Sequence, residues 1–268
     1  MSFPPLPVPL RFLVKGASTV TWTSTRTPAR TDLVYARVVE EQLLATGRPT
    51  EVHIDAMSAA RTAPILRTWE REVANLTPDV IVLHYGHMEC IHAVIPKWVE
   101  RHARAQRDRP GPVRERYRHL VVRPAWKLLA RGQQQIDRVL PLSAFRRRPR
   151  RVTALLERYI GHVSRFRRPL VVVMGLTAPA DIWKPWFPGL EPRLRVMDAA
   201  LKDMVARLGH PDVQFVEVWD EAETWRARGE EPCADGGHYT PAFHRHIGTK
   251  VTATIEQWLA APGSDVSA

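Results

Sequence analysis

Short apolar runs alternate along the chain with longer segments in which apolar residues recur every three or four positions. Five runs have the composition of buried strands: 11–16, 51–57, 79–86, 169–176 and 213–220. Nearly continuous apolar runs of about four to eight residues are typical of parallel strands that helices cover on both faces. The pattern therefore predicts a mostly parallel, five-stranded sheet.

The segments between these runs have the periodicity of amphipathic helices. In 28–47, for example, Tyr35, Val39 and Leu43 fall on one helical face, and Gly47 ends the pattern. The other expected helices are 62–76, 151–166, 191–209 and 240–260. Strands that alternate with helices indicate an α/β fold, a three-layer α/β/α sandwich.

Two stretches carry candidate chemistry at the edge where ligands bind in such folds, the carboxyl ends of the strands. Ser18 directly follows the first strand, whereas Asp235 and His238 lie in a glycine-containing loop before the last helix. An aspartate three residues before a histidine can contact one ring nitrogen, which leaves the other to accept a proton from a serine. The alternatives are a turn serine, a capping aspartate and a surface histidine.

The two stretches together resemble sequence blocks of the SGNH (GDSL-type) hydrolases. Gly16-Ala17-Ser18-Thr19 is similar to their first block, and Asp235-Gly236-Gly237-His238 to their final Asp-x-x-His block. The resemblance implies a flavodoxin-like fold and a triad of Ser18 as nucleophile, His238 as general base and Asp235 as its partner. It also implies ester or thioester hydrolysis, or acyl transfer to a specific acceptor, without a cofactor.

The resemblance has three departures. Ala17 replaces the aspartate of the first block, and Ala59 replaces the glycine of the second, although its backbone amide remains. Met88 stands where the third block has asparagine, and methionine cannot donate a hydrogen bond. His87 or His84 is a candidate substitute donor. The oxyanion hole expected from the resemblance therefore consists of Ser18, Ala59 and His87.

Aromatic residues gather on the same predicted edge. The stretch 178–190 leaves the fourth strand with two tryptophans and a phenylalanine. Ligand sites are mostly apolar with a few polar groups, so these residues can line an acyl or aryl pocket. The alternative is that they pack the proline-rich loop on the core. The substrate-binding residues expected here are Trp22, Met88, Trp183 and Trp186.

Other kinds of site find less support. The chain has no glycine-rich loop followed by Lys-Ser/Thr, which argues against a nucleoside triphosphatase. His244 and His246 alternate on the last predicted helix and face different ways, and the two cysteines form no ligand cluster. We therefore expect no metal ion. Asp220 is read as a helix-capping or surface residue.

The charge is concentrated in one segment. Residues 101–151 hold 15 Arg and one Lys against three acidic residues, a charge of +13, so the rest of the chain carries −2 of the total of +11. We expect a helical insertion over about 92–150, broken at Pro110, Pro112 and Pro124, within one domain of residues 1–260. The tail 261–268 is expected to be disordered.

Three explanations of this segment remain open: a solvated insertion, a lid whose arginines attract an anionic or carrier-linked acyl substrate, and a surface for anionic membrane or nucleic acid. The last would make the protein a non-catalytic polyanion-binding protein. No recognised nucleic-acid motif surrounds the arginines, so we rank this function below an enzyme acting on a small-molecule acyl ester or thioester.

The start of the chain is interrupted by prolines and lacks the layout of a secretory signal. No run is long enough to span a bilayer, and two cysteines are no disulfide framework. We expect a cytoplasmic protein with reduced thiols.

Overall fold

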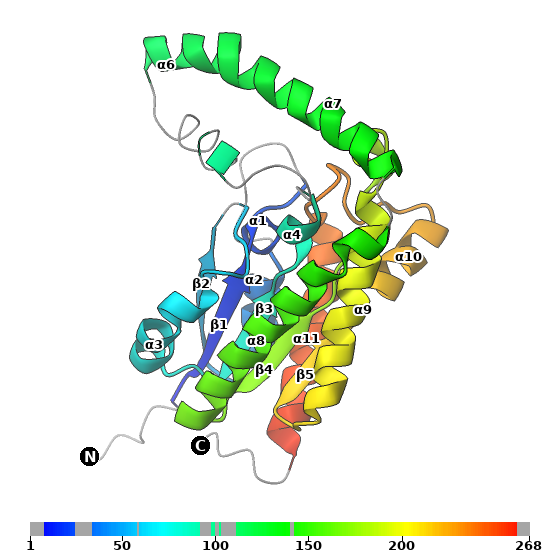
Figure 1. Ribbon diagram of the computed structural model, residues 1–268. Helices are drawn as coiled ribbons and strands as arrows, with labels where there is room; N and C mark the ends of the chain where they lie inside the picture. The colour runs from blue at the N-terminus through cyan, green and yellow to red at the C-terminus, as the bar shows by residue number, and fades with distance from the viewer. Residues whose placement is uncertain are drawn as a thin grey trace, which may run out of the picture.

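A five-stranded parallel sheet forms the centre of the molecule (Figure 1). This computed structural model describes residues 8–24, 34–57, 59–91, 98–99, 102, 111–139 and 142–261. The strands are β1 (Leu10–Gly16), β2 (Thr50–Ala56), β3 (Val80–His84), β4 (Leu170–Met174) and β5 (Val213–Val216), in the order β2-β1-β3-β4-β5. Every neighbouring pair is parallel. The expected α/β/α fold is confirmed, and its strand order reverses between β1 and β3, where ligands bind in doubly wound sheets.

Helices cover both faces of the sheet. One layer contains α2 (Tyr35–Ala45) and α11 (Pro241–Ala260), and the other contains α3 (Ile65–Leu76), α8 (Arg147–Phe166) and α9 (Leu190–Leu208). The remaining elements are α1 (Ser18–Thr21), α4 (His87–Ile91), α6 (Pro112–Tyr117), η2 (Arg118–Val122), α7 (Arg123–Val139), η3 (Leu142–Phe145), η4 (Asp181–Trp183) and α10 (Trp219–Ala227).

The residues of strand β1 are apolar at almost every position because both faces of the strand are buried. Phe12 and Val14 pack in the core between the sheet and the layer of α2 and α11, whereas Leu13 packs on the opposite side. All three are at most 1% exposed, because β1 has a neighbouring strand on each side and a helix layer on each face. Burial of each such side chain contributes about 1.5–3 kcal/mol, so the fold positions the end of β1 firmly.

Two element boundaries differ from those expected. The run 213–220 contains the strand only to Val216, and Trp219 already begins α10. Val218 and Trp219 are buried in the helical connection, and an apolar pattern alone does not distinguish this from a longer strand. Helix α8 begins at Arg147, four residues earlier than predicted, inside the segment assigned to the insertion. Residues 28–33 of the expected first helix lie outside the described residues.

Residues 112–139 of the basic insertion form one long helical arm, made of α6, η2 and α7, on the side of the molecule where the strands end (Figure 1). The expected break at Pro124 is wrong, because the helix continues through it. The π-helical turn η2 immediately precedes this proline, and its wider turn leaves room for a ring that would clash with the carbonyl of a regular turn. Pro112 begins α6, and Pro110 and the tail 262–268 lie outside the described residues.

The carboxyl-terminal part of the arm makes polar contacts with the α/β core. Gln133 Nε2 donates to the backbone oxygen of Ile91 at 2.7 Å. Arg193 of α9 donates to both carboxylate oxygens of Asp137, at 2.6 and 3.0 Å, and both side chains are buried. Within the described ranges, no helix has the combined length and apolar character that crossing a membrane requires.

Candidate active site

Ser18 lies at the point where β1 turns into the short helix α1. The preceding Gly16 allows this turn, because a Cβ atom there would lie 2.8 Å from the backbone oxygen of His84 at the end of β3 and still closer to the side chain of Val20. Such contacts leave no room for any other residue. The small Ala17 is the buried N-cap position of α1. The glycine and alanine thus present the serine at the carboxyl edge of the sheet.

The loop that contains Asp235 and His238 is held by its own hydrogen bonds. Asp235 Oδ1 accepts from the backbone amides of Gly237 at 3.0 Å and His238 at 2.8 Å. Gly236 has a φ of +97°, a conformation that glycine adopts without steric cost. The indole Nε1 of Trp183 donates to the backbone oxygen of Asp235 at 3.0 Å, so a residue of the neighbouring loop fixes the turn from outside.

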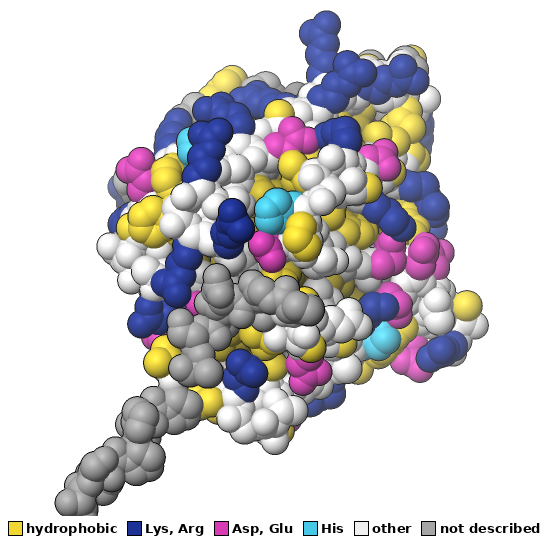
Figure 2. All heavy atoms as spheres, turned by 90° about the horizontal axis from the view of Figure 1, so that it is seen from below, with side chains coloured by type: hydrophobic (Ala, Val, Ile, Leu, Met, Phe, Trp, Pro, Cys, Tyr) yellow, Lys and Arg dark blue, Asp and Glu magenta, His cyan; other side chains and the backbone are white. Residues whose placement is uncertain are grey.

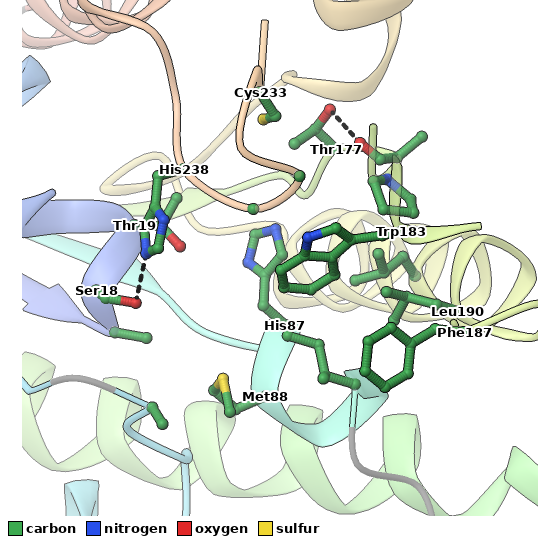
Figure 3. A pocket seen from close by; sticks show the side chains of 18 residues that line it. Ser18, Thr19, His87, Met88, Thr177, Trp183, Phe187, Leu190, Cys233 and His238 are labelled. Atoms are coloured by element: carbon green, nitrogen blue, oxygen red, sulfur yellow. Dashed lines mark hydrogen bonds between the residues drawn. The ribbon is translucent and has the colours of Figure 1, made fainter. Parts of the chain in front are cut away.

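The structure brings these two stretches together, although Ser18 and His238 are 220 residues apart in the chain. His238 Nδ1 lies 2.7 Å from Asp235 Oδ2, and His238 Nε2 lies 2.9 Å from Ser18 Oγ (Figure 3). Partial burial alone would raise the pKa of Asp235, but hydrogen bonds from His238 and from the two amides lower it below its usual value. The aspartate is therefore ionised, and the network assigns the Nδ1 proton to the His238–Asp235 bond. Nε2 is left to accept the serine proton.

A cavity of about 250 Å³ opens beside Ser18 and His238. Figure 3 shows Ser18 and His238 on one side of it and Trp183, Phe187 and Leu190 on the other. The lining residues are Ala17, Ser18, Thr19, Ala59, His87, Met88, Ile91, Thr177, Ala178, Pro179, Trp183, Phe187, Leu190, Leu194, Cys233, Gly236, Gly237 and His238. Most of these side chains are apolar. The arrangement therefore offers a nucleophile at the edge of a predominantly hydrophobic cavity.

The residues expected at the oxyanion hole also line this cavity. Ala59 has a φ of +55°, in the left-handed region that favours glycine. An alanine holds this conformation at a cost of about 1–3 kcal/mol. Strained backbone of this kind is common at functional sites.

His87 and Met88 are adjacent in α4, and both line the cavity. Burial and the nearby His238 lower the pKa of His87 to about 4, so its ring is neutral near pH 7 and has one N–H donor. Its Nε2 atom is buried and has no hydrogen-bond partner among the described residues. His84, the other candidate donor, is buried in β3 outside the cavity lining, with its ring centroid 5.4 Å from that of His87.

The expected substrate-binding residues divide into two pairs. Met88 and Trp183 line the cavity, whereas Trp22 and Trp186 do not. The Trp22 ring packs 5.5 Å from the His238 ring, and the Trp186 side chain is 60% exposed. Trp22 and Trp186 lie near the edge in sequence, but this does not determine which way a side chain points in a turn.

The cavity wall opposite Ser18 also contains Phe187, Leu190 and Leu194. With Trp183, these residues follow helical spacing across the start of α9, at i, i+4, i+7 and i+11. That spacing was a signal in the sequence. It places Trp183 and Phe187 on one face, but Trp186 is four residues before Leu190 and fits the same spacing, so the spacing alone does not separate the two tryptophans.

The remaining histidines of α11 have structural contacts. His244 Nδ1 accepts from the backbone amide of Tyr35 at 3.1 Å, and its Nε2 lies 3.1 Å from the backbone oxygen of Trp22. His246 faces a different neighbour, Glu221, at 2.7 Å. Across the described part of the chain, no group of three or more His, Cys, Asp or Glu residues could hold a metal ion.

Comparisons with known proteins place the fold in context. A scan of protein-family models finds no match, and a search of curated proteins finds none either. Among solved structures, the chain is similar to a lipase/acylhydrolase from Enterococcus faecalis, with a TM-score of 0.58 and 14% identity over 92% of this chain and 96% of that one.

Two further similar structures are esterases. One is the inhibitor-bound aryl esterase of M. smegmatis, with a TM-score of 0.55 and 14% identity over 93% of this chain and 99% of that one. The other is a carbohydrate acetylesterase family member from Sinorhizobium meliloti, with a TM-score of 0.56 and 12% identity over 94% of this chain and 100% of that one. At these identities the likeness concerns the fold, and it confirms the fold that the resemblance to the SGNH hydrolases implied.

Proposed function

We propose that this protein is a serine hydrolase that cleaves an acyl ester or thioester through Ser18, His238 and Asp235. The observation that carries the proposal is the continuous chain Asp235–His238–Ser18, with separations of 2.7 and 2.9 Å, at the edge of an apolar cavity. A nucleophile within hydrogen-bond distance of a base, which a carboxylate orients, is the arrangement that activates a serine for acyl transfer.

In the first half-reaction, Ser18 Oγ attacks the carbonyl carbon while His238 Nε2 takes the serine proton. The carbonyl π electrons move to the oxygen, which becomes the oxyanion of a tetrahedral intermediate. When this intermediate collapses, the bond to the leaving alkoxide or thiolate breaks and His238 returns the proton to that group. Asp235 remains ionised throughout and stabilises the imidazolium form of His238. The product is an acyl ester of Ser18.

In the second half-reaction, water attacks the acyl carbon and gives a proton to His238. When the second tetrahedral intermediate collapses, the bond between the acyl carbon and Ser18 Oγ breaks, His238 returns the proton to Ser18 Oγ, and the carboxylic acid leaves. The backbone amides of Ser18 and Ala59 and the neutral ring of His87 are our assignment for the oxyanion donors. Each such donor contributes about 10²–10³-fold in rate when it is aimed at the developing charge.

The cavity supports an apolar acyl or aryl group as the part of the substrate that is recognised. Trp183, Phe187 and Leu190 form the wall opposite the nucleophile, and aromatic rings bury large areas at little entropic cost. No Lys, Arg, Asp or Glu side chain is among the described residues that line the cavity, so it offers no ion-pair partner to a charged acyl group.

Acyl transfer to a specific hydroxyl or amine is the second candidate. The observation in its favour is Met88, which lies in the cavity wall and cannot donate to an oxyanion. A site with fewer oxyanion donors hydrolyses simple esters slowly and gains from an acceptor that is bound beside Ser18. The chemistry differs only in that the acceptor replaces water in the second half-reaction.

The test is hydrolysis of short and medium p-nitrophenyl esters and acyl thioesters, together with labelling by a fluorophosphonate probe. We expect Ser18→Ala and His238→Ala to lower kcat/KM by about 10³-fold or more and to abolish labelling. Ser143→Ala, at an exposed serine of η3, is the matched control and should behave as wild type. Labelling without turnover would favour acyl transfer. Turnover that survives in Ser18→Ala would refute the proposed function.

A further inference from the structure

The His238 loop, residues 231–238, is connected to the loop after β4 through Arg226, which lies in the last turn of α10 and is 21% exposed at its side chain. Its Nη2 atom donates to the backbone oxygen of Ala178 at 2.8 Å and to Glu231 Oε1 at 3.1 Å. Its Nε atom donates to Glu231 Oε2 at 3.2 Å. A guanidinium group that binds both oxygens of one carboxylate is held in a defined orientation.

Glu231 extends this connection to the backbone of the His238 loop. The same Oε1 atom accepts a hydrogen bond from the backbone amide of Cys233 at 3.0 Å. The backbone oxygen of Cys233 in turn accepts from the amide of Gly236 at 2.7 Å. Gly236 directly follows Asp235, whose carboxylate contacts His238. A continuous series of hydrogen bonds therefore runs from the guanidinium group to the turn that presents the proposed general base.

The other end of the connection is a wall of the cavity. Ala178 is 3% exposed and lines the cavity, as Cys233 does. The same loop continues to Trp183, whose indole donates to the backbone oxygen of Asp235 at 3.0 Å. The loop after β4 is thus joined to the His238 loop at two points, directly through the indole and indirectly through the guanidinium group and its carboxylate partner.

The ion pair of Arg226 and Glu231 differs from pairs on the surface. Figure 2 shows Lys and Arg interspersed with Asp and Glu on the face seen from below, and pairs between such exposed side chains contribute little to stability. In this pair, each member also binds a backbone atom of a loop that lines the cavity. Glu223 provides the contrast, because it accepts from Nη1 of the same arginine at 2.9 Å but belongs to α10 itself and is 49% exposed.

We propose that Arg226 is a positioning residue for the general base, on which it acts through Glu231 and the His238 loop. Neither Arg226 nor Glu231 is among the described residues that line the cavity, so their effect on the reaction is indirect. The role of His238 as the base rests on the proposed function, whereas the hold of the arginine on the loop does not. Because Ala178 lines the cavity, the same guanidinium group also fixes the separation between the cavity wall and the base.

The kinetic test compares Arg226→Gln and Glu231→Gln with Glu223→Gln, the matched control, which removes a carboxylate from the same guanidinium group. Without the link, Trp183 still holds the loop, so we expect a shift of less than about 1 Å and a fall in kcat for p-nitrophenyl acetate of about tenfold. KM should stay within about twofold of the wild-type value. The double variant should lose no more than the more affected single variant, because the two residues act as one unit. Glu223→Gln should keep kcat within about twofold of wild type.

Hydrogen exchange tests the hold on the loop without reference to activity. The amides of Gly236, Gly237 and His238 are hydrogen-bonded within the loop. They should exchange several-fold faster in Arg226→Gln and at the wild-type rate in Glu223→Gln. If wild type neither hydrolyses esters nor reacts with the fluorophosphonate probe, the proposed function fails, and exchange alone decides whether the arginine holds the loop.

Three results would overturn this inference. An equal loss of kcat in Glu223→Gln would mean that the charge of α10 matters and the link does not. A rise in KM with kcat unchanged would limit the arginine to supporting the cavity wall. Unchanged exchange at the three amides in Arg226→Gln, or a kcat within threefold of wild type, would mean that the loop is positioned without the arginine. If calorimetry shows that Arg226→Gln does not fold, the isosteric Glu231→Gln decides by the same two measurements.

Discussion

Replacing Gly236 with alanine tests whether the loop of Asp235 and His238 is positioned by its contact with Trp183. A Cβ atom at this position would lie 2.7 Å from Cε2 of Trp183 and still closer to Nε1 and Cδ1. Either the indole or the loop must therefore move. Both movements disturb the hydrogen bond from Trp183 Nε1 to the backbone oxygen of Asp235.

The expected size of the effect follows from this geometry. Relief of the clash requires a movement on the order of 1 Å, and a catalytic group misplaced by that distance loses about 10²-fold in rate. The backbone contributes separately, because alanine at a φ of +97° is strained by about 1–2 kcal/mol. For a chain of this size, each kcal/mol lowers Tm by about 2–4 °C.

Gly229→Ala separates the two contributions. Gly229 has a φ of +82°, and a Cβ atom there would meet nothing within 4 Å, so this variant has the backbone strain without the clash. We expect both variants to lose a few degrees in Tm, measured by differential scanning calorimetry. Only Gly236→Ala should lose about 10²-fold in kcat/KM on a p-nitrophenyl ester. If Gly236→Ala keeps activity within threefold of wild type, contact with Trp183 does not position the His238 loop, and the reasoning fails.

Two further predictions concern the cavity. Trp183→Ala should raise KM for long or aromatic acyl esters several-fold more than KM for acetyl esters. Trp186 is exposed, so Trp186→Ala is the control and should leave KM for both kinds of ester near the wild-type value. Equal effects of Trp183→Ala on all esters would exclude an acyl-binding wall. The pKa of His87 is lowered from its ordinary value of about 6.5 to about 4. Between these two pH values the unfolded chain binds more protons than the folded chain, so the free energy of unfolding should fall as the pH is lowered from about 6.5 towards 4. Denaturant unfolding at pH 7 and pH 5 should show a smaller loss in His87→Gln than in wild type, and an unchanged loss would refute a neutral, buried His87.

The proposed site contains an ionised aspartate and a neutral histidine, and the surroundings of each side chain determine its protonation state. Hydrogen bonds from its neighbours keep Asp235 ionised, and burial keeps His87 neutral. An ionised aspartate orients the general base, and a neutral imidazole can donate to an oxyanion without carrying a charge into an apolar cavity. The same burial raises the pKa of the Cys233 thiol in the cavity wall, so this cysteine remains a protonated, inert lining residue.

The arm formed by α6, η2 and α7 exposes apolar as well as basic side chains. Leu120, Leu128 and Val139 are 74%, 71% and 84% exposed, although they lie on a helix beside the candidate active site. Gln133 and Asp137 hold the far end of this helix to the core. The last turns of the arm are therefore fixed to the core.

The sequence by itself determined the class of fold and the location of the candidate chemistry. Hydrophobic periodicity depends on local geometry alone, because a strand alternates and a helix repeats within a few residues. Five strands and their covering helices could therefore be predicted. Parallel strands end at one edge, which placed Ser18 there, and the resemblance to the SGNH hydrolases predicted that Asp235 and His238 meet it.

Only the tertiary structure decided which neighbouring side chains share a site. Trp183 and Trp186 are three residues apart, yet one lines the cavity and the other faces solvent; His87 lines it while His84 is buried in β3. Whether a side chain faces the cavity, the core or solvent depends on how the helices, strands and loops pack together. The periodicity within one helix or strand contains no information about which element packs against it.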